Sequence, residues 1–405
     1  MRAHAPQRVE PPPEVAVAQW PNGRVVTDGL PPLVALVCGL VLVAVRAPGG
    51  VGGFFNPGVF ARRDAGQYLS IARHGYQMRF DCHRAPHTVL AHVHVCGNVT
   101  WFPGYPLLIR VVSVTGLRLA VAGLLIAWVF WYLALLMVWL LTAPAPERPR
   151  TAWNTATRWL CLLLAAFFPG MIYFAAVFPL SMAVFGMLAC CYWSARSPNL
   201  PLAALAGVLA GSAYLTTVAV IPGLAIAALV ATDRRARIAM CLAAAGVVGG
   251  VLAVLAYAQV AVGHWNAYFI TEHAEYHLGV HDPAATVINR YESLLPLPAS
   301  MAGRAAAEQG LLVALVLALV LAGFVACVRA GLEPADIVLA VAVPGLWLIP
   351  YFGGGHVAIY RAEALLVILV PLLRRLPVWV LVLPVAAAIW VAAAMAPAFF
   401  SNGLV

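Results

Sequence analysis

Two neighbouring stretches of the chain decide what its fold can be: residues 61–77, ARRDAGQYLSIARHGYQ, and residues 101–110, WFPGYPLLIR. Both belong to the segment 54–110, which is the longest part of the chain rich in charged and polar residues. Its first half contains Arg62, Arg63, Asp64, Arg73, His74, Arg79, Asp81, His83 and Arg84. Charged side chains at this density are not stable in hydrocarbon. The segment is therefore predicted to lie at or beyond a membrane surface, between apolar segments that enter the membrane.

The composition around this segment is that of a polytopic membrane protein. The chain has 405 residues, of which 63% are hydrophobic and 10% charged, and its mean hydropathy is +0.91. The net charge is +9, and all 24 basic residues are arginine. Most of these arginines lie at the ends of apolar segments, which is typical of topology signals and not of a nucleic-acid-binding face.

The apolar segments predict about eleven transmembrane helices in one domain. Residues 1–31, rich in proline, are expected to form a disordered cytoplasmic arm, and residues 32–405 a single transmembrane domain. Residues 200–230 are too long for one span and are predicted to split into two short helices. The polar outer loops are expected at about 46–118, 263–307 and 352–363, with helices lying near the membrane surface at 68–76 and 105–115.

The distribution of arginine gives the expected orientation. With the N-terminus in the cytoplasm, most arginine clusters fall inside: Arg148, Arg150, Arg158, Arg196, Arg234, Arg235, Arg237, Arg329, Arg374 and Arg375. The three polar loops then face outside, and the first loop carries its own arginines against the rule. Arginines on the outer side, against the positive-inside rule, indicate that these side chains have a role other than setting the topology.

Three further features of the polar loops have ordinary explanations. Cys82 and Cys96 would pair if the first loop is extracytoplasmic. The loop histidines fit no standard zinc spacing, so no metal site is predicted from His83, His87, His92 and His94. The Asn98-Val99-Thr100 sequon is expected to occur by chance.

The spacing within the first loop resembles that of a known family. The pattern Asp64-x-x-x-Tyr68-Leu69-x-Ile71-Ala72-x-x-Gly75-Tyr76, followed by Phe102-Pro103-x-Tyr105-Pro106-Leu107-Leu108-x-Arg110, resembles the first outer loop of the PIG-V-like GT-C membrane glycosyltransferases. The resemblance implies an all-α, GT-C-like bundle and a multi-pass enzyme of the cell membrane with an extracytoplasmic active site. It also implies a polyprenyl-phosphate-linked donor, most often of mannose, and inversion at the anomeric carbon. The acceptor would be a glycolipid, a glycan or a protein. Arg63 stands where the family has tryptophan.

The resemblance and the chemistry of glycosyl transfer together suggest roles for individual residues. Asp64 is the candidate general base, although an aspartate at this position could equally cap the following helix. Arg361 is the candidate for binding the donor phosphate, with Tyr360 and His356 nearby; the alternative is an arginine that anchors a helix at headgroup level. Further substrate contacts are expected from Arg63, Tyr68, Tyr105, Arg110, Trp265 and Glu272. No metal or other cofactor is expected.

Two other classes of protein remain open at this stage. A multi-pass transporter or lipid flippase would need charged residues and broken helices near the middle of the membrane, and most charges here lie at helix ends or in loops. A membrane protein without catalysis would tolerate substitution at both Asp64 and Arg361.

Overall fold

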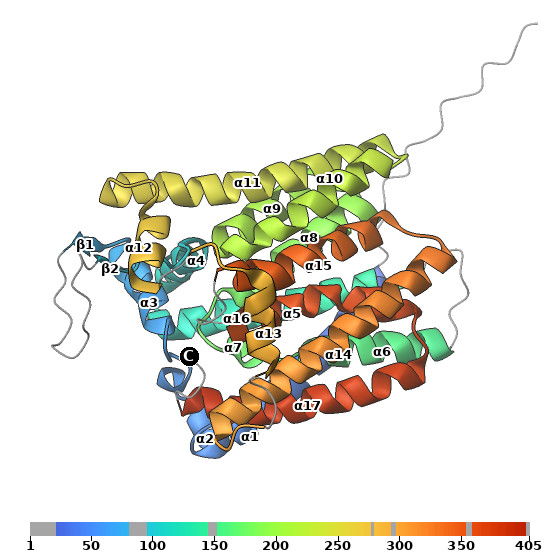
Figure 1. Cartoon of the computed structure of the whole chain (residues 1–405), viewed down its shortest axis with the longest axis horizontal. Coiled ribbons are helices and arrows are strands. Elements are labelled where there is room, and N and C mark those ends of the chain that lie inside the picture. The colour runs from blue at the N-terminus through green and yellow to red at the C-terminus, as the bar shows by residue number, and fades with distance from the viewer. Residues whose placement is uncertain are drawn as a thin grey trace, which may run out of the picture.

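The computed structural model describes residues 22–80, 95–144, 152–276, 279–292, 297–353 and 359–401. These segments contain seventeen α-helices and a single small sheet, in which β1 (Met78–Phe80) pairs antiparallel with β2 (Val95–Gly97). The long helices lie side by side along the long axis of the molecule (Figure 1). Helix α1 (Asn22–Arg46) begins within the segment predicted to be a disordered arm, and the residues before Asn22 lie outside the described part.

Within the described residues, six helices are long and apolar enough to cross a membrane. They are α1 from Asp28 onward, α5 (Leu119–Leu141), α11 (Arg234–Val262), α14 (Met301–Ala330), α15 (Pro334–Phe352) and α17 (Val378–Phe400). The shortest has 19 residues, which at about 1.5 Å per residue approaches the thickness of a hydrocarbon core of about 30 Å. The chain is thus an all-α protein with the features of a polytopic membrane protein.

The predicted number of about eleven transmembrane helices is not confirmed. The other predicted spans are shorter helices: α6 (Ala152–Ala166), α8 (Leu180–Cys191), α9 (Leu200–Ala213), α10 (Val220–Val230) and η4 (Leu365–Arg375). All twelve residues of α8 are buried. Such a core helix has the same composition as a membrane span, so hydropathy does not separate them. The predicted division of residues 200–230 is confirmed, because α9 ends at Ala213 and the turn η3 (Leu215–Ala219) leads into α10.

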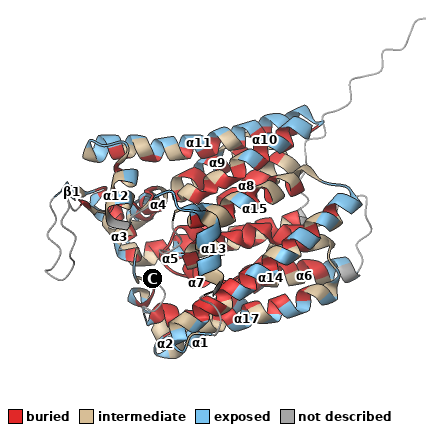
Figure 2. Ribbon diagram, in the orientation of Figure 1, coloured by how far each residue is buried: buried red, intermediate tan, exposed pale blue. Residues whose placement is uncertain are grey.

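Burial follows the layers of the bundle. Buried positions dominate the central helices α5 and α8, whereas the peripheral helices α11 and α17 alternate between buried and exposed positions (Figure 2). Large apolar side chains are exposed on the periphery, among them Leu229 at 82%, Val260 at 87% and Leu383 at 70%. In water such surfaces would promote association, and in a bilayer they face the lipid.

Helices α9 and α11 approach each other through glycines at a spacing of four. Gly207 and Gly211 of α9 face Gly246 and Gly250 of α11. A Cβ atom at Gly211 would lie 2.1 Å from a backbone oxygen of α11. Small residues at this spacing let two helix backbones approach closely. Such close packing matters in a membrane, because lipid tails are as apolar as the helices and provide no hydrophobic driving force for association.

The polar elements gather at one end of the bundle, here called the loop end (Figure 1). It comprises α2 (Gly50–Phe54), η1 (Pro57–Val59), α3 (Ala65–His74), β1, β2, α4 (Gly104–Ser113) and α12 (Ala267–Tyr276). The predicted surface helices at 68–76 and 105–115 correspond to α3 and α4, and α12 packs on β2. The first and second polar loops therefore meet at the same end, as the predicted topology requires.

The remaining short elements complete the bundle. Helix α7 (Ile172–Ala175) and the π-helical turn η2 (Tyr192–Arg196) flank α8, and α13 (Pro283–Glu292) packs on α15. Helix α16 (Ile359–Ala364) leads directly into η4. At the end of the bundle opposite the loop end, here called the network end, Arg196, Arg374 and Arg375 form ion pairs with Glu333 and Asp336.

Candidate active site

The structure brings together Asp64 and Arg361, which are 297 residues apart in the sequence. Nη1 of Arg361 donates a hydrogen bond to Oδ2 of Asp64, and the two groups form an ion pair. Asp64 directly precedes α3, but its side chain makes no capping hydrogen bond to that helix. The carboxylate therefore reaches across to α16 and does not act as a helix cap.

Arg361 is the less exposed member of this pair. Its side chain is 11% exposed, against 23% for Asp64, and its guanidinium carbon lies 5.8 Å from the centre of the Phe178 ring. Burial lowers the pKa of Arg361 to about 10, which still leaves it charged at neutral pH. An arginine that anchors a helix at the headgroup level would extend toward solvent, so this alternative does not describe Arg361.

Helix α3 is held in place by an apolar face that points into the bundle. Ala65, Tyr68, Ile71 and Ala72 recur at helical spacing and are buried. The Tyr68 ring packs edge-to-face against Tyr105 and Phe178, with ring centres 5.9 and 5.8 Å apart. This packing fixes the start of α3, and with it the position of Asp64.

The second half of the first loop is bound to α3 through Asn98. Its Oδ1 accepts a hydrogen bond from the Gln77 backbone at 2.8 Å, and its Nδ2 donates to the Gly75 carbonyl at 3.1 Å. The Tyr76 hydroxyl donates to the Trp101 carbonyl at 3.0 Å. Because Asn98 is only 2% exposed and uses both ends of its amide, the sequon has a structural explanation.

Helix α16 is positioned by Gly170, which lies in the turn between α6 and α7. Gly170 has a φ of +86°, and a Cβ atom there would lie 2.7 Å from the Cβ of Ala364. On the other side, the buried Gln309 of α14 donates from Nε2 to the Tyr360 carbonyl at 2.9 Å. A glycine in the left-handed region thus makes room for α16, and Arg361 is held against α3.

Other predicted substrate-binding residues lie near the pair or in the packing behind it. Arg63 has a φ of +53°, in the left-handed region that side chains other than glycine rarely adopt, and lies near Tyr173. The Tyr105 hydroxyl is already used, because it donates to the Gly123 carbonyl at 2.8 Å. The Tyr360 ring lies 5.7 Å from the Arg290 guanidinium carbon.

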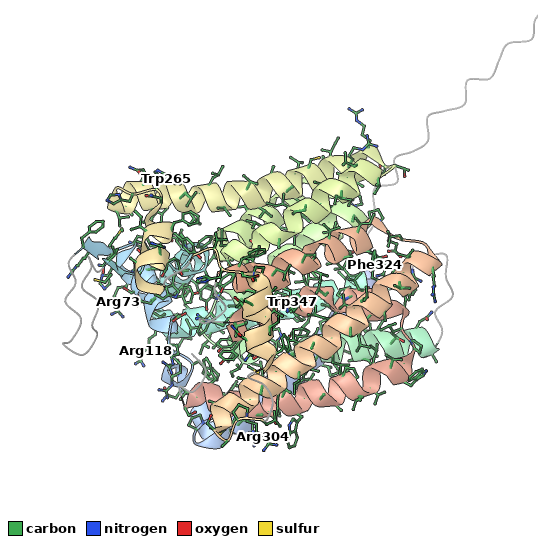
Figure 3. The ribbon with its side chains drawn as sticks, viewed as in Figure 1. Arg73, Arg118, Trp265, Arg304, Phe324 and Trp347 are labelled. Atoms are coloured by element: carbon green, nitrogen blue, oxygen red, sulfur yellow. The ribbon has the colours of Figure 1, made fainter. Side chains whose placement is uncertain are left out.

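Two predicted substrate-binding residues, Arg110 and Trp265, are not joined to the pair. Arg110 is exposed on α4, and Trp265 is 57% exposed at the turn between α11 and α12 (Figure 3). Neither residue makes a hydrogen bond, ion pair or ring contact with Asp64 or Arg361. Glu272 lies on α12 near Tyr268 and Tyr214. His356 lies outside the described residues.

The predictions for metal and disulfide fall largely outside the described part. Cys96 is bonded in a disulfide, whereas Cys82 and the four loop histidines lie outside the described residues. The remaining cysteines within the described residues are free: Cys38, Cys161, Cys190, Cys191, Cys241 and Cys327. Within the described ranges, no group of three histidine, cysteine or acidic side chains could hold a metal ion.

Several groups around the pair were not predicted from the sequence. Phe178 and Tyr173 lie in an apolar run whose composition predicts only a membrane span, so no signal in the sequence identifies them. Glu363 follows Arg361 by two positions, and its charge inside an apolar helix is a signal that could have been used. A cavity of about 470 Å³ lies at the network end, beside Arg374 and Arg375, and is not part of this site.

The geometry places a carboxylate and a largely buried guanidinium in direct contact at the loop end of a membrane bundle. Such a pair can accept a proton at the carboxylate and bind a phosphate at the guanidinium. In comparisons with known proteins, no family model matches the chain and no curated protein matches it significantly.

Proposed function

We propose that the chain is a membrane glycosyltransferase. It would move a sugar, most often mannose in the family it resembles, from a polyprenyl-phosphate donor to a lipid, glycan or protein acceptor on the extracytoplasmic face. The observation that carries the proposal is the ion pair between Asp64 and Arg361, because the residues predicted separately as base and phosphate ligand meet in one site.

The two residues would divide the reaction between them. Asp64 removes the proton from the acceptor hydroxyl as its oxygen attacks the anomeric carbon. The bond from that carbon to the phosphate oxygen breaks, and its electrons leave with the polyprenyl phosphate. Arg361 neutralises the charge that develops on this leaving group. Attack from the side opposite the phosphate inverts the anomeric carbon.

The contact between base and cation also suggests an order of events. In the resting protein the Asp64 carboxylate is held by Arg361. A donor phosphate competes for the same guanidinium. As Arg361 turns toward the phosphate, Asp64 is released to contact the acceptor hydroxyl, so that base and acceptor meet when a donor is bound.

The surface near the pair suits a lipid-linked substrate. Helix α4 packs on α3 and exposes apolar side chains at Leu107, Val111 and Val114, of which Val111 is 65% and Val114 84% exposed. A helix with one buried and one exposed apolar side at the end of a membrane bundle is suited to the lipid interface. A polyprenyl chain in the membrane would reach the site from there.

The test is sugar transfer by the purified protein in lipid nanodiscs, with radiolabelled polyprenyl-phosphate mannose and a host lipid extract as acceptor. Asp64→Asn should reduce transfer by about 10²- to 10⁴-fold, and the matched carboxylate variant Glu308→Gln, away from the pair on α14, should transfer like the wild type. Full turnover by Asp64→Asn would exclude Asp64 as the base. Transfer from a different polyprenyl sugar only would keep the enzyme class and change the donor.

A transporter or lipid flippase is the second candidate, favoured by the broken helices of the bundle. The run from α9 through η3 to α10 is interrupted at Tyr214, and α8 ends in the π-helical turn η2. This reading predicts movement of a lipid across proteoliposome membranes without sugar transfer. The same Asp64→Asn variant separates the two functions, because only the enzyme requires its carboxylate as a base.

A further inference from the structure

A cavity of about 470 Å³ opens at the network end, at the other end of the bundle from Asp64 and Arg361. Its walls come from the end of α5, from α6, and from the segment in which η4 ends and α17 begins. The polar and aromatic residues that line it are Thr142, Asn154, Thr157, Arg374, Arg375 and Trp379. The volume falls within the range of about 300–1,000 Å³ that small-molecule sites occupy. Residues 145–151, between α5 and α6, lie outside the described part and are not counted in the site.

The packing of the surrounding helices fixes the shape of this cavity. Helix α6 packs on α5, η4 and α17, and α6 and α17 lie side by side in Figure 1. The chain passes from η4 to α17 through Leu376 and Pro377 alone, so the end of one helix and the start of the next form a single wall. Both Arg374 and Arg375 close η4, and Val378 opens α17.

The charged groups that line the cavity are positive. The side chains of Arg374 and Arg375 are 5% and 15% exposed. Together with Arg196 they form three guanidinium groups, paired with the two carboxylates of Glu333 and Asp336. The described residues that line the cavity include both arginines and neither carboxylate. The cavity wall therefore favours an anion and disfavours a cation.

The start of α17 adds to this preference. Val378 and Trp379, the first two residues of this helix of 23 residues, line the cavity, and Pro377 before them provides no side-chain cap. The first N–H groups of a helix have no intrahelical partner, and the helix dipole places positive partial charge there. The helix start and the two arginines thus present positive charge to the same cavity.

An apolar surface leads away from the rim of the cavity along α17. Trp379 at the rim is 76% exposed, and Leu383 and Trp390 further along the helix are 70% and 65% exposed. These three positions fall on one face of an α-helix. Tryptophan is enriched where a membrane meets water. A molecule with its charged group in the cavity can therefore lay hydrocarbon chains along this face of α17.

These features together select the ligand. Guanidinium groups bind phosphate through charge-assisted hydrogen bonds. Basic pockets between transmembrane helices at the cytoplasmic surface bind the head groups of anionic lipids, and the arginine distribution predicts that the network end is cytoplasmic. A soluble phosphate would use the cavity but not the apolar face of α17.

We propose that the network-end cavity binds the phosphate group of an anionic phospholipid whose acyl chains lie along the exposed face of α17. This site is separate from the Asp64–Arg361 pair, and lipid binding does not depend on glycosyl transfer. It can be measured without any sugar donor.

The test is native mass spectrometry of the full chain released from detergent micelles. The chain is titrated with phosphatidylglycerol, with phosphatidylcholine of the same acyl chains, or with glycerol phosphate. The wild type should bind one phosphatidylglycerol about tenfold more tightly than phosphatidylcholine, because choline brings a cation toward the arginines. Glycerol phosphate, which has no acyl chains, should bind more weakly than the anionic lipid.

Two variants test the cavity itself. Arg375→Gln removes a guanidinium from the wall and should weaken phosphatidylglycerol binding by about tenfold or more, as expected for losing a hydrogen bond to a charged group. Ala143→Phe places a ring at the cavity wall without changing any charge and should weaken binding as well. Its effect remains readable if Arg375→Gln folds poorly, which size-exclusion chromatography and circular dichroism would show. The matched control is Arg329→Gln, an exposed arginine in the last turn of α14, which should bind like the wild type.

The outcomes are distinct from those of the sugar-transfer assay. A preference for phosphatidylglycerol that Arg375→Gln and Ala143→Phe lose and Arg329→Gln keeps would support the site, with or without sugar transfer. Equal affinities for phosphatidylglycerol in the wild type and in both cavity variants would overturn it, and so would equal binding of the two lipids by the wild type. Glycerol phosphate binding as tightly as the lipid would assign the cavity to a soluble phosphate and overturn the lipid as its occupant.

Discussion

Each end of the bundle places arginine against acidic residues, but the two arrangements differ in how completely the charges are paired. At the network end, Arg374 binds Asp336 through two hydrogen bonds, of 2.5 and 2.9 Å. Asp336 also accepts from the Glu333 backbone in the capping box of α15. Glu333 in turn is contacted by Arg196, Arg374 and Arg375 at 3.2 to 3.3 Å.

At the loop end the charges are paired sparsely. Asp64 and Arg361 share one hydrogen bond, and the capping role open to Asp64 is not used. Two residues further along α16, Glu363 is buried near the Tyr351 hydroxyl and Arg290, and it forms no ion pair as close as those of the network end among the described residues. Buried charges that satisfy one another make a rigid support, whereas charges left partly unpaired are available to a ligand. We therefore expect the network end to support the fold, and we propose the loop end as the place for chemistry.

The largest effect expected from this difference is on stability at the network end. Asp336→Ala removes both hydrogen bonds to Arg374 and half of the capping box, and leaves a buried guanidinium partly unpaired. Breaking such a pair costs about 3–5 kcal/mol. The thermal midpoint in detergent should fall markedly, and sugar transfer per folded molecule should not change. A midpoint equal to the wild type would show that the network does not support the fold.

Glu363 should make stability depend on pH. Burial raises the pKa of Glu363 in the folded protein from 4.5 to about 7, so the folded state favours the protonated carboxyl. The stabilisation that this gives to the folded state is complete below about pH 4.5 and is lost as the pH rises to about 7, a change of about 3 kcal/mol in the free energy of unfolding. The groups that face it are Arg290, Tyr291 and Tyr351.

The measurement for Glu363 is the difference in thermal midpoint between the wild type and Glu363→Gln from pH 4.5 to pH 8. Relative to the variant, the wild type should lose stability as the pH increases. Taking the difference removes the contribution of other carboxyl groups. A difference independent of pH would mean that Glu363 has an ordinary pKa.

Arg361→Lys tests whether the loop end needs the geometry of a guanidinium or only its charge. Lysine keeps the charge but binds phosphate through a single ammonium group. Sugar transfer should fall by about 10²-fold, equivalent to about 2.7 kcal/mol, while stability changes little because the pair has one hydrogen bond. Arg374→Lys is the matched variant and should show the reverse, with lower stability and unchanged transfer per folded molecule.

The smallest effect is expected at an exposed pair that belongs to neither arrangement. Arg304 and Glu308 are one helical turn apart on α14 at 3.0 Å, and the Arg304 side chain is 59% exposed. Exposed pairs of this kind contribute about 0.5 kcal/mol or less. Arg304→Gln should leave both the thermal midpoint and transfer near wild type. A large loss would point to an unrecognised role for this part of α14.

Part of the site was predictable because it depends on local sequence. The spacing of Tyr68, Ile71 and Ala72 predicted a helix with one buried face, and α3 is that helix. Asp64 was chosen as a candidate from the resemblance of the first loop, and Arg361 from its place at the start of a late helix on the predicted outer side. The choice between capping and catalysis for Asp64 could not be made from the sequence, because both need an aspartate at the start of a helix.

The number of membrane spans was the least predictable part of the fold. Hydropathy measures composition, and the buried helix α8 is as apolar as helices that face lipid. The close approach of α9 and α11 at Gly207 and Gly211 was also not foreseen, since glycine spacing in one segment does not show which partner it meets. Both depend on which helices become neighbours.

The sequence by itself determined the class of the protein and the place of its polar segment. Hydrophobic content and the density of charge between 54 and 110 are enough, because hydrocarbon excludes charge whatever the arrangement of the helices. Only the tertiary structure decided that Asp64 meets Arg361 and that Glu363 is buried among tyrosines. Contacts between residues nearly 300 positions apart arise from packing along the whole bundle, which no local pattern contains.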